Sequence, residues 1–149
     1  MDTLFRKACS LFIVGVPGRE LDSESRLLVE NGAGVILFSR NLSDWREGFE
    51  LVRQVHDCAR PRKPLVCIDQ EGGRVQRLGP PFIQLPPMEV LGRRGDPSLC
   101  RRLARQLGAE LRAAGTWLDF APVLDCNTNP ANPVIGDRSF GDDPALVAK

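Results

Sequence analysis

The sequence has little net charge and no long hydrophobic run. Its 149 residues contain 20 Lys and Arg against 19 Asp and Glu, a formal net charge of +1. This balance excludes the broad basic field that nonspecific nucleic-acid binding usually needs, so we expect no nucleic-acid partner. No apolar run approaches the roughly 18 residues of a membrane-spanning helix. The first run, residues 11–14, is also too short for a signal peptide, and we expect a cytoplasmic protein without membrane contact.

Histidine is scarce and the cysteines are scattered, which removes several kinds of site. The one histidine, His56, lies in a charged amphipathic segment, so a serine or cysteine nucleophile activated by histidine has little support. The cysteines are odd in number and form no CxxC pair, which argues against a disulfide framework or a zinc site. We therefore expect reduced thiols and no metal. The five cysteines are Cys9, Cys58, Cys67, Cys100 and Cys126.

Short apolar runs alternate with amphipathic segments along the whole chain. The βαβαβαβα order predicts an α/β fold with a parallel sheet and right-handed crossovers. Two architectures share this pattern, the doubly wound sheet and the (β/α)8 barrel, and both bind ligands at the carboxyl ends of their strands. Asp-Pro pairs at 96–97 and 143–144 supply helix N-caps. We expect strands within residues 8–14, 34–38, 65–68 and 117–124, helices over residues 23–31, 43–59 and 96–114 and from residue 143 onward, and long loops over residues 70–95 and 126–142.

The most informative stretch follows the third expected strand, in residues 68–78 (IDQEGGRVQRL). Asp69 stands at the carboxyl end of that strand, where a carboxylate can accept two sugar hydroxyls or pair with a cation. Gly72 and Gly73 allow a sharp turn and a close backbone approach to a ligand. Arg77 offers a planar fork of donors for a hydroxyl pair or a carboxylate. The residues alone leave a second interpretation open, in which an internal salt bridge merely orders the loop.

A second informative stretch lies in the loop after the fourth expected strand. Arg138 is flanked by glycines there and leaves the same edge of the sheet as Asp69. We expect Asp125 and Asp137 to hold the Arg138 guanidinium in place as supporting residues. A role for Arg138 as a buried staple of the loop is the alternative that the residues leave open.

Four segments, which span most of the chain, carry a specific resemblance when they are taken together. They are residues 32–41 (GAGVILFSRN), 67–77 (CIDQEGGRVQR), 120–125 (FAPVLD) and 135–144 (IGDRSFGDDP). In this order they resemble glycoside hydrolase family 3, and within it the bacterial β-N-acetylglucosaminidases of cell-wall recycling. The resemblance implies a (β/α)8 barrel with parallel strands in sequential order and retaining hydrolysis of terminal β-linked N-acetylglucosamine. It also implies that Asp69, Arg77 and Arg138 bind the sugar of a glycan or muropeptide, with no metal or organic cofactor.

The sequence departs from this family in its extent. A complete (β/α)8 barrel takes about 250 residues, whereas four βα units occupy all 149 residues here. Family members continue to a Lys-His-Phe-Pro-Gly-His-Gly segment, to the His–Asp pair that acts as acid/base, and to an aspartate nucleophile. None of these occurs in the sequence. We therefore expect residues 1–149 to be the first half of such a barrel domain, ending within its fourth helix, with no catalytic residue and no activity alone.

Two other functions remain under consideration. A catalytically dead sugar-binding module would retain the wall formed by Asp69, Arg77 and Arg138. A doubly wound α/β domain that binds another small ligand would show a reversal of strand order, although the sequence carries no motif for one. In the half-barrel interpretation, the apolar residues 8–14 and 117–120 lie on unpaired edge strands, which promote self-association.

Overall fold

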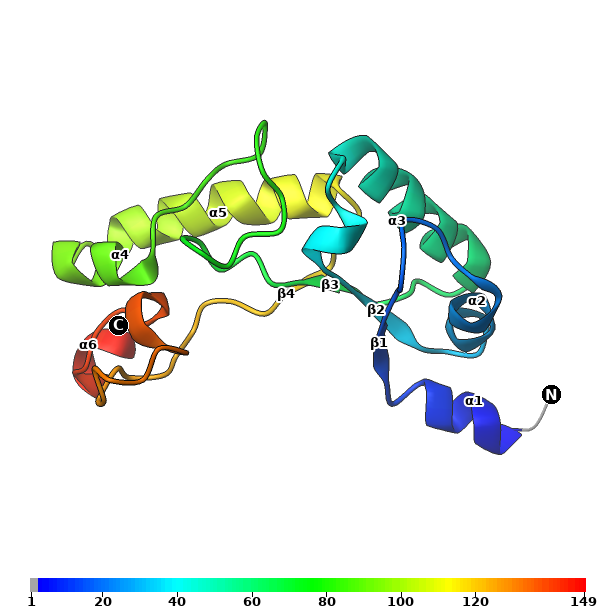
Figure 1. Ribbon diagram of the computed structural model, residues 1–149, viewed down its shortest axis with the longest axis horizontal. Coiled ribbons are helices and arrows are strands. Elements are labelled where there is room, and N and C mark those ends of the chain that lie inside the picture. Colours follow the sequence, from blue (N-terminus) through cyan, green and yellow to red (C-terminus); the bar gives the residue numbers. More distant parts are fainter. Residues whose placement is uncertain (1–2) are drawn as a thin grey trace. The chain divides into compact units, whose positions relative to one another are not determined.

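The computed structural model describes residues 3–149 of the chain and divides into two compact units. The first unit consists of the described residues up to Ile68 together with Leu111–Asp119. The second unit consists of Asp69–Glu110 and Phe120–Lys149. Figure 1 follows the chain through both units by colour. The first unit holds the sheet, and the second holds the long loops that follow the last two strands.

Four short parallel strands form one sheet in the first unit, in the order of the sequence. The two strands at the centre of the sheet are the most buried, and all three residues of β3 are inaccessible to solvent. The register pairs Val14 with Val35, Val35 with Val66, and Cys67 with Leu118. The sequential order confirms the succession of βα units expected for a barrel and excludes the doubly wound order within the described sheet. The strands are β1 (Ile13–Gly15), β2 (Gly34–Leu37), β3 (Val66–Ile68) and β4 (Leu118–Asp119).

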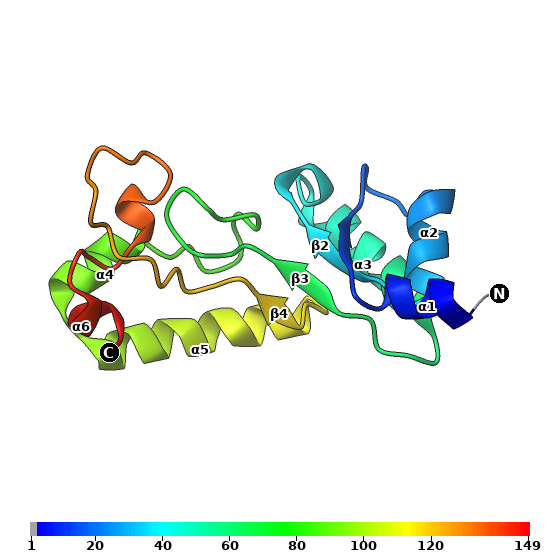
Figure 2. The same ribbon diagram turned by 90° about the horizontal axis from the view of Figure 1, so that it is seen from below.

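Two amphipathic helices of the first unit, α2 (Ser23–Glu30) and α3 (Trp45–Ala59), pack against each other beside the sheet (Figure 2). Each begins at an aspartate that caps its free backbone N–H groups, as Asp22 does by accepting from Ser25. That hydrogen bond lowers the pKa of Asp22. A short 3-10 helix, η1 (Ser39–Asn41), connects β2 to α3. The buried face of α3 consists of Leu51, Val52, Val55 and Ala59.

The first expected strand was placed too early in the chain. Residues 8 and 9 belong instead to a helix, α1 (Thr3–Cys9), and the strand starts only at Ile13. The helix ends where the backbone N–H groups of Ser10 and Phe12 donate to carbonyls within its last turns. A nearly continuous apolar run of seven residues has no periodicity that separates one helical turn from a strand, which explains the error.

The second unit contains three helices, α4 (Met88–Arg94), α5 (Pro97–Ala113) and α6 (Pro144–Val147), with α5 running on into the first unit. Asp96 caps α5 by accepting from Leu99, and Asp143 caps α6 by accepting from Ala145, which confirms both Asp-Pro helix starts. No helix among residues 3–149 is both long enough and apolar enough to cross a membrane.

The helix α4 corrects the expectation of an unbroken loop over residues 70–95. Its sequence offers only one apolar turn, Met88 and Leu91, which is too short for a helical period to show. The helix ends at Gly95, whose backbone is left-handed with φ of 63°. Within the second unit, α4 packs against a 3-10 helix, η2 (Gly136–Arg138), that lies in the loop after β4.

We predict opposite effects for one substitution at two glycines of the second unit. A Cβ at Gly92 of α4 would lie 1.7 Å from the Phe140 carbonyl oxygen, whereas a Cβ at Gly108 of α5 would meet no atom within 4 Å. Gly92→Ala should therefore lower the free energy of unfolding by about 1–3 kcal/mol. Gly108→Ala should raise it by about 1 kcal/mol, because alanine is the better helix former. Urea denaturation measures both, and a destabilised Gly108→Ala would contradict the helix assignment there.

We also predict that the chain self-associates through its sheet edges. Among residues 3–149, β1 and β4 each have a strand partner on one side only, and Ile13 on β1 is exposed. Sedimentation velocity should show association that grows with concentration. Ile13→Lys should suppress it because an edge lysine blocks strand addition. Val90→Lys places the same charge at an exposed apolar position on α4 and serves as the control. A wild-type chain that stays monomeric at every concentration would refute the prediction.

Candidate functional site

The site begins at the residue that directly follows β3, and a tight turn in the second unit shapes it. The backbone N–H of Glu71 donates to Val75 at 2.9 Å, and the N–H of Val75 donates back to Gly72 at 3.1 Å. Gly72 has a φ of 113°, and a Cβ there would lie 2.7 Å from the Pro86 carbonyl oxygen. The glycines therefore do allow a sharp turn, and the close approach they permit is to the chain around Pro86.

Gln70 holds this turn from the inside. Its side chain is fully buried, and its carbonyl oxygen accepts from the backbone N–H groups of Arg77 at 2.7 Å and Leu78 at 3.0 Å. Its amide nitrogen donates to the Leu78 carbonyl oxygen at 3.0 Å. One side chain thus replaces the backbone partners that a regular element would supply, and it fixes the position from which the Arg77 side chain leaves the chain.

Asp69 and Arg77 lie against each other at the carboxyl end of β3. Arg77 Nη2 donates to Asp69 Oδ2 at 2.9 Å, and the two side chains are 23% and 21% exposed. Both charges are thus partly accessible. An ionised carboxylate can accept further hydrogen bonds beyond the one from Arg77, so the Asp69 side of the pair can still receive hydroxyl groups.

Arg138 is held by Glu71, and this corrects the expectation that Asp137 and Asp125 hold it. Its Nε and Nη2 atoms donate to the two carboxylate oxygens of Glu71, each at 2.7 Å. Glu71 is only 5% exposed, whereas Arg138 is 22% exposed. These hydrogen bonds raise the pKa of Arg138, the burial of the guanidinium opposes that rise, and the charges of Asp125 and Asp69 add to it.

Asp137 pairs with a different arginine, Arg74. The Nε atom of Arg74 donates to Asp137 Oδ1 at 2.9 Å. Its Nη2 atom also lies 2.9, 2.7 and 3.1 Å from the carbonyl oxygens of Pro133, Val134 and Ile135. Arg74 therefore anchors the backbone of the loop that leads into η2, and Asp137 pairs with Arg74 rather than holding Arg138.

Asp125 reaches the site through its backbone rather than by an ion pair. Its carbonyl oxygen lies 2.6 Å from the hydroxyl oxygen of Ser139, a residue that is almost fully buried. The Ser139 hydroxyl oxygen also accepts from the Gly141 N–H at 3.1 Å. Ser139 thus ties the two ends of the loop together immediately after Arg138.

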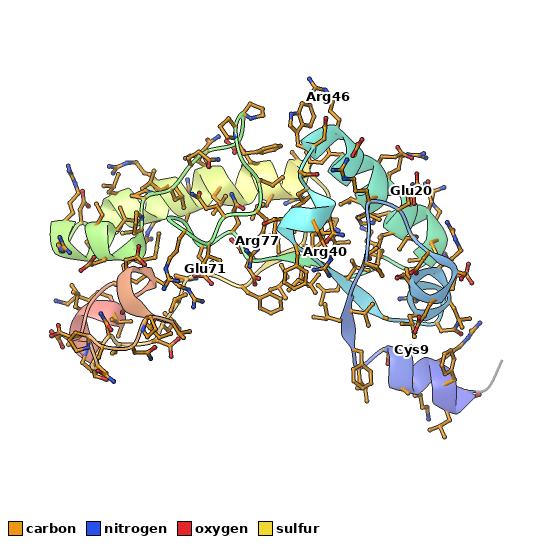
Figure 3. All side chains as sticks on the ribbon, in the orientation of Figure 1. Cys9, Glu20, Arg40, Arg46, Glu71 and Arg77 are labelled. Atoms are coloured by element: carbon orange, nitrogen blue, oxygen red, sulfur yellow. The ribbon has the colours of Figure 1, made fainter. Side chains whose placement is uncertain are left out.

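Asp69, Arg77 and Arg138 lie close enough for their charges to interact within the second unit. Asp69 contacts Arg77, and its charge acts on Arg138. Figure 3 labels Glu71 and Arg77, which both leave the segment that follows β3. A partly exposed carboxylate beside two partly exposed guanidinium groups suits a polyhydroxylated ligand, because it offers acceptors and donors within one small region.

Sequence reasoning missed three residues that organise this site: Glu71, Gln70 and Arg74. Gln70 and Glu71 both lie within the stretch of residues 68–78 that the sequence singles out, but no local pattern shows which partner each side chain takes. In the structure Gln70 and Glu71 are both buried, and Asp69 before them is partly exposed. No comparable pattern connects Arg74 with Asp137, which lies 63 residues further along the chain.

No group of three or more histidine, cysteine, aspartate or glutamate side chains in residues 3–149 is arranged to hold a metal ion. The five cysteines are free thiols in the structure, and the burial of Cys58 raises its pKa. The site described here consists of carboxylates, guanidinium groups and backbone.

Comparison with known proteins identifies the family to which this fold and these motifs belong. The model of the glycosyl hydrolase family 3 N-terminal domain matches residues 4–149. The chain belongs to glycosyl hydrolase family 3. A β-hexosaminidase of Xanthomonas euvesicatoria pv. vesicatoria is 40% identical over 146 residues, which cover 93% of this chain and 43% of that protein. A β-hexosaminidase of Stenotrophomonas maltophilia is 38% identical over the same shares. The chain thus spans less than half the length of these curated relatives.

Solved structures of the family agree with this fold. A family 3 β-N-acetylglucosaminidase from a Paenibacillus species superposes with a TM-score of 0.90 at 39% identity, over 99% of this chain and 29% of that one. NagZ from Neisseria gonorrhoeae, solved in complex with N-trifluoroacetyl-D-glucosamine, superposes with a TM-score of 0.78 at 34% identity, over 92% of this chain and 42% of that one. The four sequential strands are therefore the first βα units of the family 3 barrel.

We predict that Gln70 is a main source of stability for the site of this family 3 chain. Gln70→Ala leaves the N–H groups of Arg77 and Leu78 without their acceptor, so the free energy of unfolding should fall by at least about 2 kcal/mol. Gln106→Ala on α5 removes only an exposed hydrogen bond to Glu110 and should stay within about 0.5 kcal/mol of wild type. Equal stabilities of the two variants in thermal unfolding would contradict the role of Gln70.

Proposed function

We propose that this chain supplies the sugar-recognition part of a β-N-acetylhexosaminidase, in which Asp69, Arg77 and Arg138 bind the hydroxyl groups of a terminal N-acetylglucosamine. The observation that carries the proposal is the proximity of these three partly exposed charges after β3 and β4. The relatives named β-hexosaminidase support the activity, and the NagZ complex with an N-acylated glucosamine supports the sugar. Parallel-strand barrels bind their ligands at the edge where β3 and β4 end.

The proposal assigns recognition, and not bond cleavage, to these residues. Retaining hydrolysis needs one carboxylate as nucleophile and a protonated group beside the leaving oxygen. Asp69, Glu71 and Asp137 each pair with an arginine, which engages at least one oxygen of each carboxylate. Carboxylate oxygens that are held in this way are encumbered nucleophiles. The resemblance to family 3 supports an acid/base and a nucleophile that lie outside this sequence in the proposed enzyme.

The same pairing favours a second candidate function, a sugar-binding module without catalysis. Both candidates predict that the chain does not hydrolyse the sugar substrate, but they differ in how tightly the chain alone binds the sugar. A module binds the sugar fully by itself, whereas half of a hydrolase site binds it only weakly until the rest of the barrel is present. The finer expectations, a muropeptide of cell-wall recycling as the glycan and a cytoplasmic location, belong to the first candidate. The family resemblance is what supports them.

We predict that the purified chain releases no p-nitrophenol from p-nitrophenyl N-acetyl-β-D-glucosaminide above the rate in buffer. Absorbance of the released phenolate measures this directly. Turnover that co-purifies with the chain and disappears in Asp69→Asn would refute the division between recognition and cleavage. Turnover that persists in that variant would instead indicate a contaminating hydrolase.

We predict that N-acetylglucosamine binds the chain weakly, with a Kd on the order of 1 mM, since few ligand atoms contribute. Chemical-shift titration in ¹⁵N-labelled protein measures the affinity and locates the shifts. Asp69→Asn should weaken binding about tenfold by removing a charged acceptor. Asp142→Asn removes the same charge from an exposed position on the neighbouring loop and should leave the Kd unchanged. Equal effects of both substitutions would contradict the site.

A further inference from the structure

Glu71 is a buried carboxylate whose two oxygens both bind the one guanidinium that the proposed function places at the sugar. We propose that Glu71 is a positioning residue, which orients Arg138 so that its remaining N–H groups face the sugar. This inference rests on the proposed function and goes beyond it, because Glu71 itself makes no contact with the ligand. Three observations carry it: the burial of Glu71, the geometry of the Arg138 donors, and the separate anchoring of the loop by Arg74.

The burial of Glu71 separates its role from that of Asp69. The two residues flank Gln70, whose side chain is buried and holds the turn from the inside. Asp69 is 21% exposed and Glu71 only 5% exposed. A sugar can therefore reach the carboxylate of Asp69, whereas the carboxylate of Glu71 is covered and fully engaged by Arg138.

The hydrogen bonds of Arg138 determine which of its donors remain for a ligand. A guanidinium has five N–H groups in a fixed plane. Glu71 takes the Nε–H and one N–H of Nη2, and the Val134 carbonyl oxygen takes one N–H of Nη1 at 3.1 Å. One N–H on each terminal nitrogen is left, and these two lie in the plane that Glu71 sets. Such a pair matches two adjacent hydroxyl oxygens only while the plane is held.

The loop that carries Arg138 has its own anchor, which makes the role of Glu71 separable. Arg74 binds the carbonyl oxygens of Pro133, Val134 and Ile135, and it pairs with Asp137. Loss of the Glu71 charge should therefore leave the backbone before Arg138 in place and free only its side chain. A merely structural staple would instead release the loop.

The experiment follows the Nε–H group of Arg138 in the ¹⁵N-labelled full chain, and it needs no ligand. Arg138→Lys identifies the resonance by removing it. In wild type the bond to Glu71 should protect this proton from exchange with water. Glu71→Gln keeps the side-chain shape but loses the charge and one acceptor, so exchange should accelerate at least tenfold. Asp142→Asn should change nothing. An Arg138 Nε–H that exchanges equally in wild type and Glu71→Gln overturns the proposal.

The sugar titration then separates positioning from a general structural role. Glu71→Gln should weaken N-acetylglucosamine binding about tenfold, with backbone resonances of residues 133–137 unmoved. In an Arg138→Lys background, Glu71→Gln should add less than a twofold loss, because its target is gone, whereas Asp69→Asn should still add its full effect. An additional loss from Glu71→Gln in that background, or collapse of the loop resonances, overturns the proposal. A wild-type chain that binds no sugar refutes the proposed function, and the exchange experiment still decides on Glu71.

Discussion

Charge neutralisation is the constraint on which the region after β3 depends. Three carboxylates, Asp69, Glu71 and Asp137, are each matched by one arginine of the same unit. An unpaired carboxylate as buried as Glu71 would cost several kcal/mol. The loop after β4 must therefore return to the segment after β3 to deliver Arg138. The arrangement of these side chains follows from this need of the protein itself.

The pairing also reconciles the two interpretations that the residues alone left open. Asp69 and Arg77 do form an internal salt bridge, and Arg138 does staple a loop. Neither observation excludes ligand binding, because Asp69, Arg77 and Arg138 all remain partly exposed. A paired and oriented charge loses less freedom on binding than a mobile one, so the internal salt bridges would reduce the entropic cost of the proposed sugar recognition.

Much of the fold was predictable from the sequence, because parallel βα units leave a strong local pattern. Buried apolar runs marked β2 and β3, and the Asp-Pro pairs marked the starts of α5 and α6. Segments of about seven residues were the failures: the last two residues of α1 were predicted as strand and α4 as loop, since one or two turns carry too little periodicity. The site residues show the same division. Asp69 follows its strand directly and could be found from the local sequence. Arg138 instead pairs with Glu71, which lies 67 residues earlier in the chain, and no local pattern predicts this partner over Asp137.

The three carbonyl oxygens gathered by Arg74 have a consequence for how this loop can evolve. The Arg74 side chain replaces the backbone N–H groups of a helix as the hydrogen-bond donor to these carbonyl oxygens. Residues 133–135 therefore need no regular secondary structure to hold their position. Upstream, Asn132 donates back to the Asn129 carbonyl oxygen at 2.9 Å and closes a small turn of its own. Insertions or deletions at that turn would be absorbed before the anchored stretch begins. The loop can thus vary in length and composition at this turn while the guanidinium of Arg138 keeps its position.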